Sequence, residues 1–434
     1  MAGVDMRSFQ ARAVAIGVVG LLACAAAATG AGGLAGAASP RVAQTGHLPA
    51  GFTDSVVANV PSPVDLVETP DHRILVADQQ GEVFVVKNGT LLATPALNIS
   101  SKVCAGASER GLLGLAVDPN FAVNGFVYVY YTFRNNTQCG TLSSNVPVNR
   151  VSRFTMAGDR LKPRSEKILI DQIISYHANH EGGDLGFGHD GMLYVSVGDG
   201  ACDYTPVMSG CDPDNTISRR GNTLHGKVLR ITSSGGIPSD NPFTGAGTAR
   251  CNHGDIAMGM TCQETYLRGF RNPFRFAFDP NSAKTRLFVN DVGEATWEEI
   301  DKAVKGADYG WNVREGHCAT GSTTDCGAPP AGLTNPIFDY SHATGCDAIT
   351  GGAFVPLGLW GAAYDTGYLY SDYICNKIFL LLPSGAGGWT SSPFATGLAS
   401  GGPVAVLFAT HGANTALYYT TYMNGGEIHV IDKS

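Results

Sequence analysis

The chain has 434 residues, of which 44% are hydrophobic and only 15% are charged, with 56 glycines and 22 prolines. This composition supplies a large apolar core and excludes a disordered chain. The formal net charge of −8 and the absence of a lysine- and arginine-rich run argue against a nucleic-acid partner.

The first 39 residues have the pattern of an export signal. Two arginines precede an apolar stretch (13–28), and small residues follow as far as residue 39. Residues 40–47 are then a linker, and residues 48–434 are the folded domain. A second interpretation stays open, because Leu21-Leu22-Ala23-Cys24 resembles a lipobox in which Cys24 carries a lipid anchor. In both cases we expect an exported protein that is secreted, periplasmic or held at the cell surface.

The chain has 11 cysteines, and those that follow Cys24 are even in number. In an exported protein this favours disulfides over metal ligands. No CxxC pair, which is typical of zinc sites, is present. Three pairs lie close together in loops: Cys202 with Cys211, Cys251 with Cys262, and Cys318 with Cys326. We expect five disulfides, although the sequence does not fix their connectivity.

Short alternating segments separated by Gly, Pro, Asn and Asp run through the whole domain, which predicts an all-β fold. One unit recurs along the chain. It has an apolar start, a turn of the type D-P-N or H-D-G, and a strand rich in Tyr, Val and Leu. The copies begin at Asp65, Gly114, Asp184, Arg275 and Val406, with a weaker copy from Gly367.

Six copies predict a six-bladed β-propeller with four-stranded antiparallel blades, in which the first and last blades close the ring. One such sheet cannot bury both faces alone, so packing blades side by side supplies the missing core and leaves few exposed edges. A series of sandwich domains is the alternative, but it predicts no unit shared along the chain.

The segment NHEGGDLGFGHDGMLYVSVGDG (179–200) combines a strand pair with polar residues at both ends. Asp190-Gly191 predicts the hairpin turn. His180 precedes a Gly-Gly pair that permits close backbone approach, and Asp199 follows the second strand. A carboxylate fixes the tautomer of an imidazole and raises its basicity, so the two residues are a candidate catalytic pair. The alternative is a loop histidine that only makes hydrogen bonds.

In LRGFRNPFRFAFDP (267–280), Arg271-Asn272-Pro273 interrupts two apolar runs. Pro273 restrains Asn272 to an extended conformation, so the strand cannot continue through it. Arg271 either locks a loop by binding carbonyls or offers a fixed cation to a substrate oxygen.

The segment NDVGEATWEEID (290–301) places Asp291, Glu294, Glu298 and Glu299 near Gly293. Oxygen-rich loops suit calcium, although this spacing is not that of an EF-hand. A solvated acidic turn is the alternative.

Six motifs in the same order resemble the glucose/sorbosone dehydrogenase family. This family includes soluble quinoprotein glucose dehydrogenases, aldose sugar dehydrogenases and the related domain of Hedgehog-interacting proteins. The resemblance covers residues 48–431. The motifs are ERGLLGLAVDPNF (109–121), residues 179–200, GNTLHGKVLRI (221–231), YLRGFRNPFRFAFDP (266–280), residues 290–301, and ADYGWNVREG (307–316).

The resemblance implies a propeller that holds pyrroloquinoline quinone (PQQ) and Ca²⁺ at one end of its axis. Such enzymes oxidise the anomeric carbon of an aldose to a lactone by hydride transfer to the quinone, and then pass the electrons to an external acceptor. His180 matches the catalytic base of the family, and Asp199 matches the carboxylate that supports it.

The other site residues of the family also have counterparts in this chain. Arg271 and Asn272 match the pair that contacts the quinone. Gly293 and Glu294 match the positions whose backbone carbonyls bind calcium. Glu109 matches a polar position near the sugar.

The chain departs from the quinoproteins where they carry a lysine and an arginine-rich segment that bind the quinone carboxylates. The corresponding places hold Ile374 and the neutral run SGGPVAV (400–406), with Lys377 as a nearby substitute. Each lost arginine would cost about 1.5–3 kcal/mol in charged hydrogen bonds. A second function therefore stays open, namely an exported propeller that binds a carbohydrate or a protein without redox chemistry. A hydrolase that uses acidic pairs in the cleft is a third.

Overall fold

The computed structural model describes residues 47–106, 108–135, 139, 146–201, 215–385, 387–398 and 401–434. The predicted export signal, Cys24, most of the linker, and the pair Cys202 and Cys211 lie outside the described residues. Among the described residues, no helix has the length and apolar character needed to cross a bilayer. Pro40–Ser434 form one unit.

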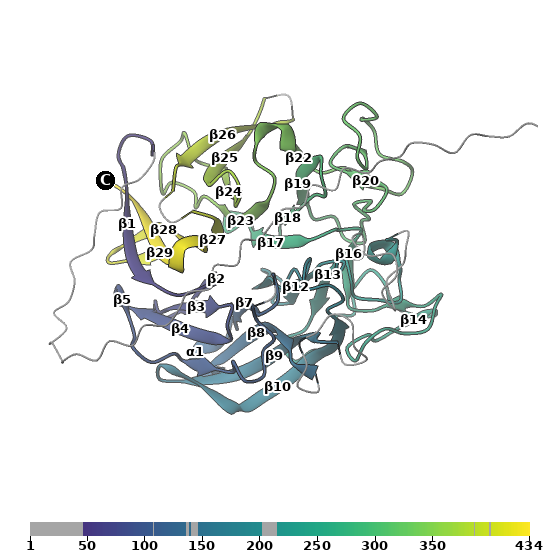
Figure 1. The fold of residues 1–434 in the computed structure, drawn as a ribbon, viewed down its shortest axis with the longest axis horizontal. Helices are drawn as coiled ribbons and strands as arrows, with labels where there is room; N and C mark the ends of the chain where they lie inside the picture. The colour runs from purple at the N-terminus through teal and green to yellow at the C-terminus, as the bar shows by residue number, and fades with distance from the viewer. Residues whose placement is uncertain are drawn as a thin grey trace, which may run out of the picture. The chain divides into compact units, whose positions relative to one another are not determined.

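Within the described ranges, six antiparallel sheets of four or five strands surround a common axis, which confirms the six-bladed propeller (Figure 1). Blade 1 contains β2 (Pro63–Glu68), β3 (Ile74–Asp78), β4 (Glu82–Lys87), β5 (Thr90–Leu91) and β6 (Leu97–Asn98). Blade 2 contains β7 (Leu112–Val117), β8 (Phe126–Phe133), β9 (Val148–Ala157) and β10 (Arg160–Ile174). Blade 3 contains β11 (Leu185–Phe187), β12 (Leu193–Val197), β13 (Lys227–Ile231) and β16 (Thr265–Arg268).

The remaining blades follow in chain order. Blade 4 contains β17 (Pro273–Phe278), β18 (Leu287–Asp291), β19 (Trp297–Lys302) and β22 (Phe338–Ser341). Blade 5 contains β23 (Ile349–Phe354), β24 (Tyr368–Asp372), β25 (Lys377–Pro383) and β26 (Trp389–Thr396). Blade 6 contains β27 (Pro403–His411), β28 (Asn414–Thr421), β29 (Glu427–Lys433) and β1 (Phe52–Asn59).

Small elements occupy the loops between these strands. They are the helices α1 (Phe121–Asn124), η2 (Ile217–Arg219), η3 (His342–Thr344) and η4 (Met423–Gly425), and the strand pairs β14 (Thr248–Ala249) with β15 (Thr261–Cys262) and β20 (Arg314–Glu315) with β21 (Cys318–Ala319).

Contacts between strands of neighbouring blades close the ring. They join β2 to β7, β7 to β11, β12 to β17, β17 to β23, β23 to β27, and β27 back to β2. The strand β1 comes from the N-terminal side and pairs with β29, so that both ends of the domain build blade 6. Phe52 of β1 packs edge-on against Trp360 with 4.9 Å between ring centroids, which also fixes this strand to blade 5.

Five copies of the sequence repeat each form the hairpin of the first two strands of a blade, which we call the inner hairpin. These inner hairpins are β2–β3, β7–β8, β11–β12, β17–β18 and β27–β28. The weaker copy from Gly367 instead covers β24–β25, the second and third strands of blade 5. It is displaced because β23 and β24 are joined by a longer loop (355–367) that lacks the D-P-N turn.

The second strands are buried on both faces. Every residue of β3, β12, β18 and β24 is buried, since each blade packs between two neighbours. Polar residues stand where these strands end. Asp78, Asp291 and Asp372 are the last residues of β3, β18 and β24, and Asp199 lies two residues after β12. Carboxylates are therefore placed at one end of the axis by several blades.

Four disulfides are present in the described residues. Cys251–Cys262 and Cys318–Cys326 join two of the pairs that lie close in the sequence. The other two bonds, whose pairing the sequence left open, are Cys104–Cys139 and Cys346–Cys375.

The Cys346–Cys375 disulfide joins residues 29 positions apart on either side of β23 and β24. Replacing both cysteines with alanine is expected to lower the free energy of unfolding by about 3–4 kcal/mol, because the bond removes loop entropy from the unfolded chain. Urea unfolding of the oxidised wild type and the variant measures this loss. Equal midpoints and slopes would contradict it.

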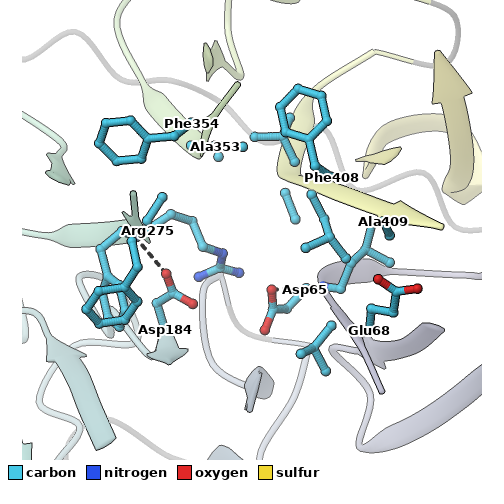
Figure 2. A pocket seen from close by; sticks show the side chains of 18 of the residues that line it. Asp65, Glu68, Asp184, Arg275, Ala353, Phe354, Phe408 and Ala409 are labelled. Carbon is cyan, nitrogen blue, oxygen red and sulfur yellow. Dashed lines mark hydrogen bonds between the residues drawn. The ribbon is translucent and has the colours of Figure 1, made fainter. Parts of the chain in front are cut away.

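A charged cluster lies on the axis, where three blades meet. The guanidinium of Arg275 on β17 points between Asp65 of β2 and Asp184, which precedes β11 (Figure 2). It donates hydrogen bonds to the backbone carbonyls of Val64 (2.6 Å) and Leu113 (3.2 Å). The cluster borders a cavity of about 420 Å³ that extends along the later halves of the inner strands. This cavity is not lined by His180 or Asp199.

Burial raises the pKa of Asp184 to about 7 and that of Asp65 to about 6, although the charge of Arg275 lowers both. The folded protein therefore binds more protons than the unfolded chain, whose aspartates titrate near 3.8. Stability is then expected to fall as the pH rises from about 4 to 7. The free energy of unfolding of the Asp184→Asn variant should depend less steeply on pH. Its slope is expected to be smaller by up to about 1.4 kcal/mol per pH unit, which corresponds to one proton. Urea unfolding across this range measures both profiles, and parallel curves would contradict a protonated Asp184.

Candidate functional site

His180 and Asp199 form a hydrogen-bonded pair at one end of blade 3. The distance from His180 Nδ1 to Asp199 Oδ1 is 2.7 Å. Both residues are buried, with exposed fractions of 4% and 0%. When the Nδ1–H donates to the carboxylate, Nε2 carries the lone pair that accepts a proton.

Glycines permit this close contact. Gly182 and Gly183 have φ angles of 60° and 101°, in the region that favours glycine. A Cβ atom on Gly198 would lie 2.0 Å from the carbonyl oxygen of His180. The Gly-Gly pair and the glycine before Asp199 therefore let the His180 segment lie directly against the end of β12.

Asp199 is held on both carboxylate oxygens. Oδ1 accepts the backbone N–H of Ala201 (2.8 Å) in addition to the bond with His180. Oδ2 accepts hydrogen bonds from Trp311 Nε1 (2.8 Å) and Asn215 Nδ2 (3.0 Å). Burial raises the pKa of Asp199, but the charge of His180 and these hydrogen bonds outweigh it and hold the pKa below its usual value. The carboxylate is therefore ionised and orients the imidazole.

Arg271 lies beside this pair. Its backbone carbonyl accepts the N–H of Asp199 (2.8 Å). Its guanidinium donates to the carbonyls of Val292 (3.2 Å) and Gly293 (2.6 Å) and lies 5.5 Å from the ring centroid of Trp311. The cation is thus held between an aromatic ring and the loop that follows β18.

Asn272 connects blade 4 to its neighbours. Its Oδ1 accepts the N–H of Gly182 (3.2 Å), and its Nδ2 donates to the carboxylate of Glu109 (3.2 and 3.3 Å). Glu109 also accepts the N–H of Glu181 (3.1 Å). Pro273 begins β17, so the predicted interruption of the strand is what frees Asn272 for these bonds.

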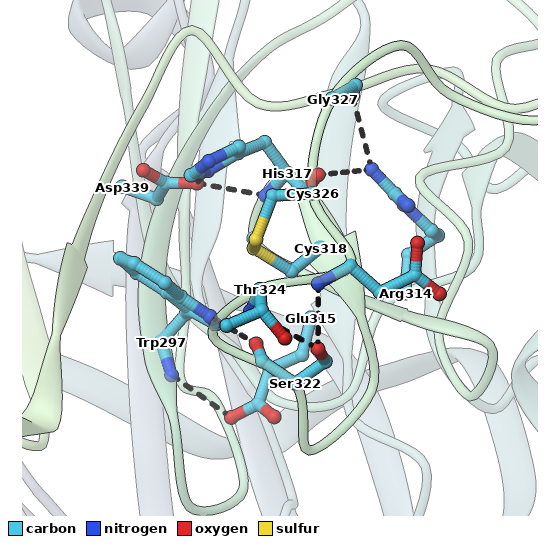
Figure 3. The surroundings of a disulfide bond; sticks show 12 residues. Trp297, Arg314, Glu315, His317, Cys318, Ser322, Thr324, Cys326, Gly327 and Asp339 are labelled. Atoms are coloured by element: carbon cyan, nitrogen blue, oxygen red, sulfur yellow. Dashed lines mark hydrogen bonds and ion pairs between the residues drawn. A yellow bond between two sulfur atoms is a disulfide. The ribbon is translucent and has the colours of Figure 1, made fainter.

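A single carboxylate organises the loop that contains Gly293 and Glu294. Glu315 Oε1 accepts the backbone N–H groups of all four residues from 294 to 297, at 2.8–3.0 Å. Burial raises the pKa of Glu315, but hydrogen bonds from the N–H groups of residues 295–297 and of Gly321 outweigh it and the pKa is lowered. Figure 3 shows Glu315 and Trp297 near the disulfide of Cys318. A Cβ on Gly293 would lie 1.7 Å from the carbonyl oxygen of Trp297, so the turn requires glycine.

Lys377 lies on blade 5. It begins β25, and its ammonium lies 6.0 Å from the ring centroid of Phe379 on the same strand. Ile374, which we expected at the lysine position of the quinoproteins, is 53% exposed. In the part of the chain that the structure describes, the hydrogen-bond network around His180 extends to Gly293 but not to Lys377.

Two residues that hold Asp199 were missed in the sequence. Trp311 is separated from Asp199 by 112 positions, although it lies in the motif ADYGWNVREG that carries the family resemblance. Asn215 follows the segment that contains Cys202 and Cys211, and no sequence pattern marks it. The Trp311 contact depends on how blades 3 and 4 pack together, whereas Asn215 lies in the same connection between β12 and β13 as Asp199.

Comparisons with known proteins agree with this fold. A family model for glucose/sorbosone dehydrogenases matches residues 60–357. Quinoprotein glucose dehydrogenase B of Acinetobacter calcoaceticus is 26% identical over 269 residues, which are 59% of this chain and 51% of that protein. Hedgehog-interacting protein of Mus musculus is 32% identical over 273 residues, which are 58% of this chain and 36% of that protein. The chain thus spans about half or less of these two relatives.

The fold is also that of a solved sugar dehydrogenase. The PQQ-bound aldose sugar dehydrogenase of Streptomyces coelicolor has a TM-score of 0.63 and 21% identity, with 89% of this chain and 100% of that chain covered. Because the family model matches more than half of the sequence, the chain belongs to the glucose/sorbosone dehydrogenase family.

Proposed function

We propose that the protein is an exported sugar dehydrogenase that oxidises the anomeric carbon of an aldose to a lactone, with His180 as the general base. Its family and its likeness to quinoprotein glucose dehydrogenase B support an oxidoreductase. The observation that carries the proposal is the buried His180–Asp199 pair, which lies against Arg271 and Asn272 of the next blade.

In this proposal His180 Nε2 takes the proton of the anomeric hydroxyl while the hydride of the same carbon leaves for the electron acceptor. The carbon–oxygen bond then becomes the lactone carbonyl. Asp199 stabilises the positive charge that develops on the imidazole and keeps its tautomer fixed. Glu109 offers a carboxylate that accepts a hydrogen bond from a sugar hydroxyl.

The side chains beside His180 fit the quinone part of PQQ, since Arg271 provides a cation and Asn272 provides an amide there. When bound, PQQ supplies the two-electron acceptor for the hydride. Arg271 would stabilise negative charge on a quinone oxygen, and Lys377 is the proposed partner of a cofactor carboxylate. The carbonyls of Gly293 and Glu294 are the proposed ligands of Ca²⁺, which would act as a Lewis acid.

Reconstitution tests this function directly. Purified protein is loaded with PQQ and Ca²⁺, and dye reduction is followed with a panel of aldoses. The expected result is turnover of at least one aldose that requires PQQ. The absence of turnover together with the absence of a PQQ-induced thermal shift would contradict the proposal. Release of aryl alcohol from an aryl glycoside without an acceptor would indicate a hydrolase instead.

A propeller that binds a carbohydrate or a protein without catalysis is the second candidate. It is favoured by the exposed Ile374 at the expected lysine position, and by the Gly293 carbonyl, which accepts a hydrogen bond from Arg271. The likeness to Hedgehog-interacting protein points the same way. This function predicts a thermal shift with a saccharide or a protein partner and none with PQQ.

A further inference from the structure

The cavity of about 420 Å³ on the propeller axis lies away from the candidate functional site. Glu68, Phe278 and Phe354 line it, and they are the last residues of β2, β17 and β23, the first strands of their blades. Asn272 of the candidate site instead directly precedes β17. The two sites therefore lie at opposite ends of the same strands. Pro280 also lines the cavity and is exposed, so the cavity is open to solvent.

Small residues on blades 5 and 6 leave room for this axial cavity. Gly351 and Gly352 of β23 and Ala405 of β27 line it. A Cβ atom on Gly351 would lie 2.8 Å from the backbone nitrogen of Val406, so the close contact between these two strands requires glycine. The short side chains at these positions leave space on the axis.

The charged cluster of Asp65, Asp184 and Arg275 forms the polar end of the axial cavity (Figure 2). Each of the four carboxylate oxygens accepts one backbone N–H, at 2.7–2.9 Å, and can accept a further hydrogen bond. Arg275 is 4% exposed, and its Nε has no hydrogen-bond partner among the residues that the structure describes. Buried donors normally have a partner, so this N–H indicates an acceptor that a ligand would supply.

The charges of this cluster nearly cancel. Burial raises the pKa of Asp65 to about 6 and that of Asp184 to about 7. Near a pH of about 6.5, the two carboxyl groups together carry about one negative charge, which offsets the positive charge of Arg275. A neutral ligand with polar groups therefore fits this end of the cavity better than an ion of either sign.

Aromatic rings form the opposite wall. Figure 2 shows Phe354 and Phe408 on one side of the cavity and the charged cluster on the other. The Phe408 ring packs against Trp360 with 4.9 Å between ring centroids, and the Phe354 ring packs against Phe288 with 4.7 Å. Both rings are held by their neighbours, so they offer a fixed apolar surface to a ligand.

We infer that the axial cavity binds a neutral saccharide of one or two rings. A pyranose has apolar C–H faces that pack on aromatic rings, and hydroxyl groups that both donate and accept hydrogen bonds. One hydroxyl oxygen would accept the Nε–H of Arg275, and other hydroxyl groups would donate to Asp65 and Asp184. The volume of the cavity lies within the range of small-molecule sites, about 300–1,000 Å³.

This binding goes beyond the oxidation proposed at His180, and it requires neither PQQ nor turnover. The test therefore uses the full-length protein without PQQ. Glucose, galactose, xylose and maltose are titrated in saturation-transfer NMR. The Glu109→Gln variant serves as the background, because it weakens sugar binding at the candidate site. We expect at least one of the four sugars to bind this variant with a Kd on the order of 1 mM. If none binds at about a hundred times that concentration, the inference is wrong, whatever the outcome of the PQQ reconstitution.

Two substitutions in the Glu109→Gln background locate the bound sugar. Arg275→Lys keeps the positive charge but removes the planar Nε–H donor. Phe408→Leu removes one aromatic wall and keeps an apolar side chain, so the test does not depend on the charged cluster alone. Each should raise the Kd at least about fivefold, with thermal unfolding as the check that the variant is folded.

Phe338→Leu is the matched control. Phe338 is half-buried like Phe408, but it lies on β22 and does not line the cavity. This variant should keep the Kd of its background. Unchanged affinity in both Arg275→Lys and Phe408→Leu would overturn the inference, because the sugar would then bind elsewhere.

Charged probes test the chemical class of the ligand. Benzoate and benzylamine share an apolar ring and carry opposite charges. Both should bind the Glu109→Gln variant more weakly than the best sugar, because the cluster offers no excess of either charge. Tighter binding of one of them, sensitive to Arg275→Lys or Phe408→Leu, would overturn the assignment of a saccharide in favour of an organic ion.

Discussion

The His180→Asn variant of the reconstituted protein is expected to oxidise aldoses with a kcat/KM about 10²–10⁴-fold below that of the wild type, because the base that takes the anomeric proton is lost. Asparagine is a suitable replacement here. His180 has a φ of 54°, a backbone conformation that asparagine adopts more readily than most residues. Its side-chain amide can still donate a hydrogen bond to Asp199, so the buried carboxylate keeps a partner.

Dye reduction measures the loss, and a thermal shift with PQQ shows whether the cofactor still binds. The His189→Asn variant is the control, since His189 is exposed in the turn of the same inner hairpin. It should retain wild-type kinetics. Aldose turnover by His180→Asn within about threefold of the wild type would exclude His180 as the base.

The fold was largely predictable because each inner hairpin carries its own local pattern. The turn and the apolar strand are contiguous, so five copies pointed correctly to β2–β3, β7–β8, β11–β12, β17–β18 and β27–β28. The placement of His180 and Asp199 at strand ends could be predicted from the same pattern, because the two residues flank one hairpin in the sequence. Blade 5 was harder to recognise because its repeat copy is displaced by one strand.

Contacts between blades could not be derived from the sequence in the same way. Glu109 meets Asn272 across 163 positions, and Trp311 meets Asp199 across 112. No periodic pattern encodes such distances, and only the family resemblance indicated that these segments converge. Asn215 lies only 16 positions from Asp199 in the same connection of blade 3, yet neither pattern nor motif marked their bond.

The acidic segment 290–301 shows how strand geometry changes the interpretation of a sequence. We predicted a calcium loop or a solvated turn that contained both Glu298 and Glu299. Both residues are buried in β19 and face opposite sides of the blade. Glu298 accepts hydrogen bonds from Gly293 and Ile349, whereas Glu299 turns toward Asp291. Counting alternate positions along the strand would have separated them.

The Asp199→Asn variant is expected to lose about 10²–10⁴-fold in kcat/KM for aldose oxidation, although it removes no group that touches the sugar. In the wild type, Oδ1 accepts from His180 and Oδ2 accepts from Trp311 and Asn215. An amide has one oxygen and one NH₂ group. If the NH₂ faces His180, the imidazole must accept at Nδ1 and carry its proton on Nε2, so it can no longer act as the base. If the NH₂ faces Trp311 and Asn215, two buried donors lose their acceptor, at about 1–3 kcal/mol each.

A second substitution separates these two orientations. Trp311→Phe removes the indole N–H but keeps an aromatic ring under Arg271. When the NH₂ group at position 199 faces Trp311 and Asn215, this change therefore removes one of the two buried donors that have lost their acceptor. The double variant Asp199→Asn/Trp311→Phe should therefore recover part of the lost activity, measured as kcat/KM at a fixed PQQ load. The stability difference between the wild type and Asp199→Asn should also close as the pH falls below about 3.8, because the lowered pKa of Asp199 contributes only while the carboxylate is ionised. Wild-type kinetics in Asp199→Asn would show that His180 needs no carboxylate partner, and the pair would then be structural.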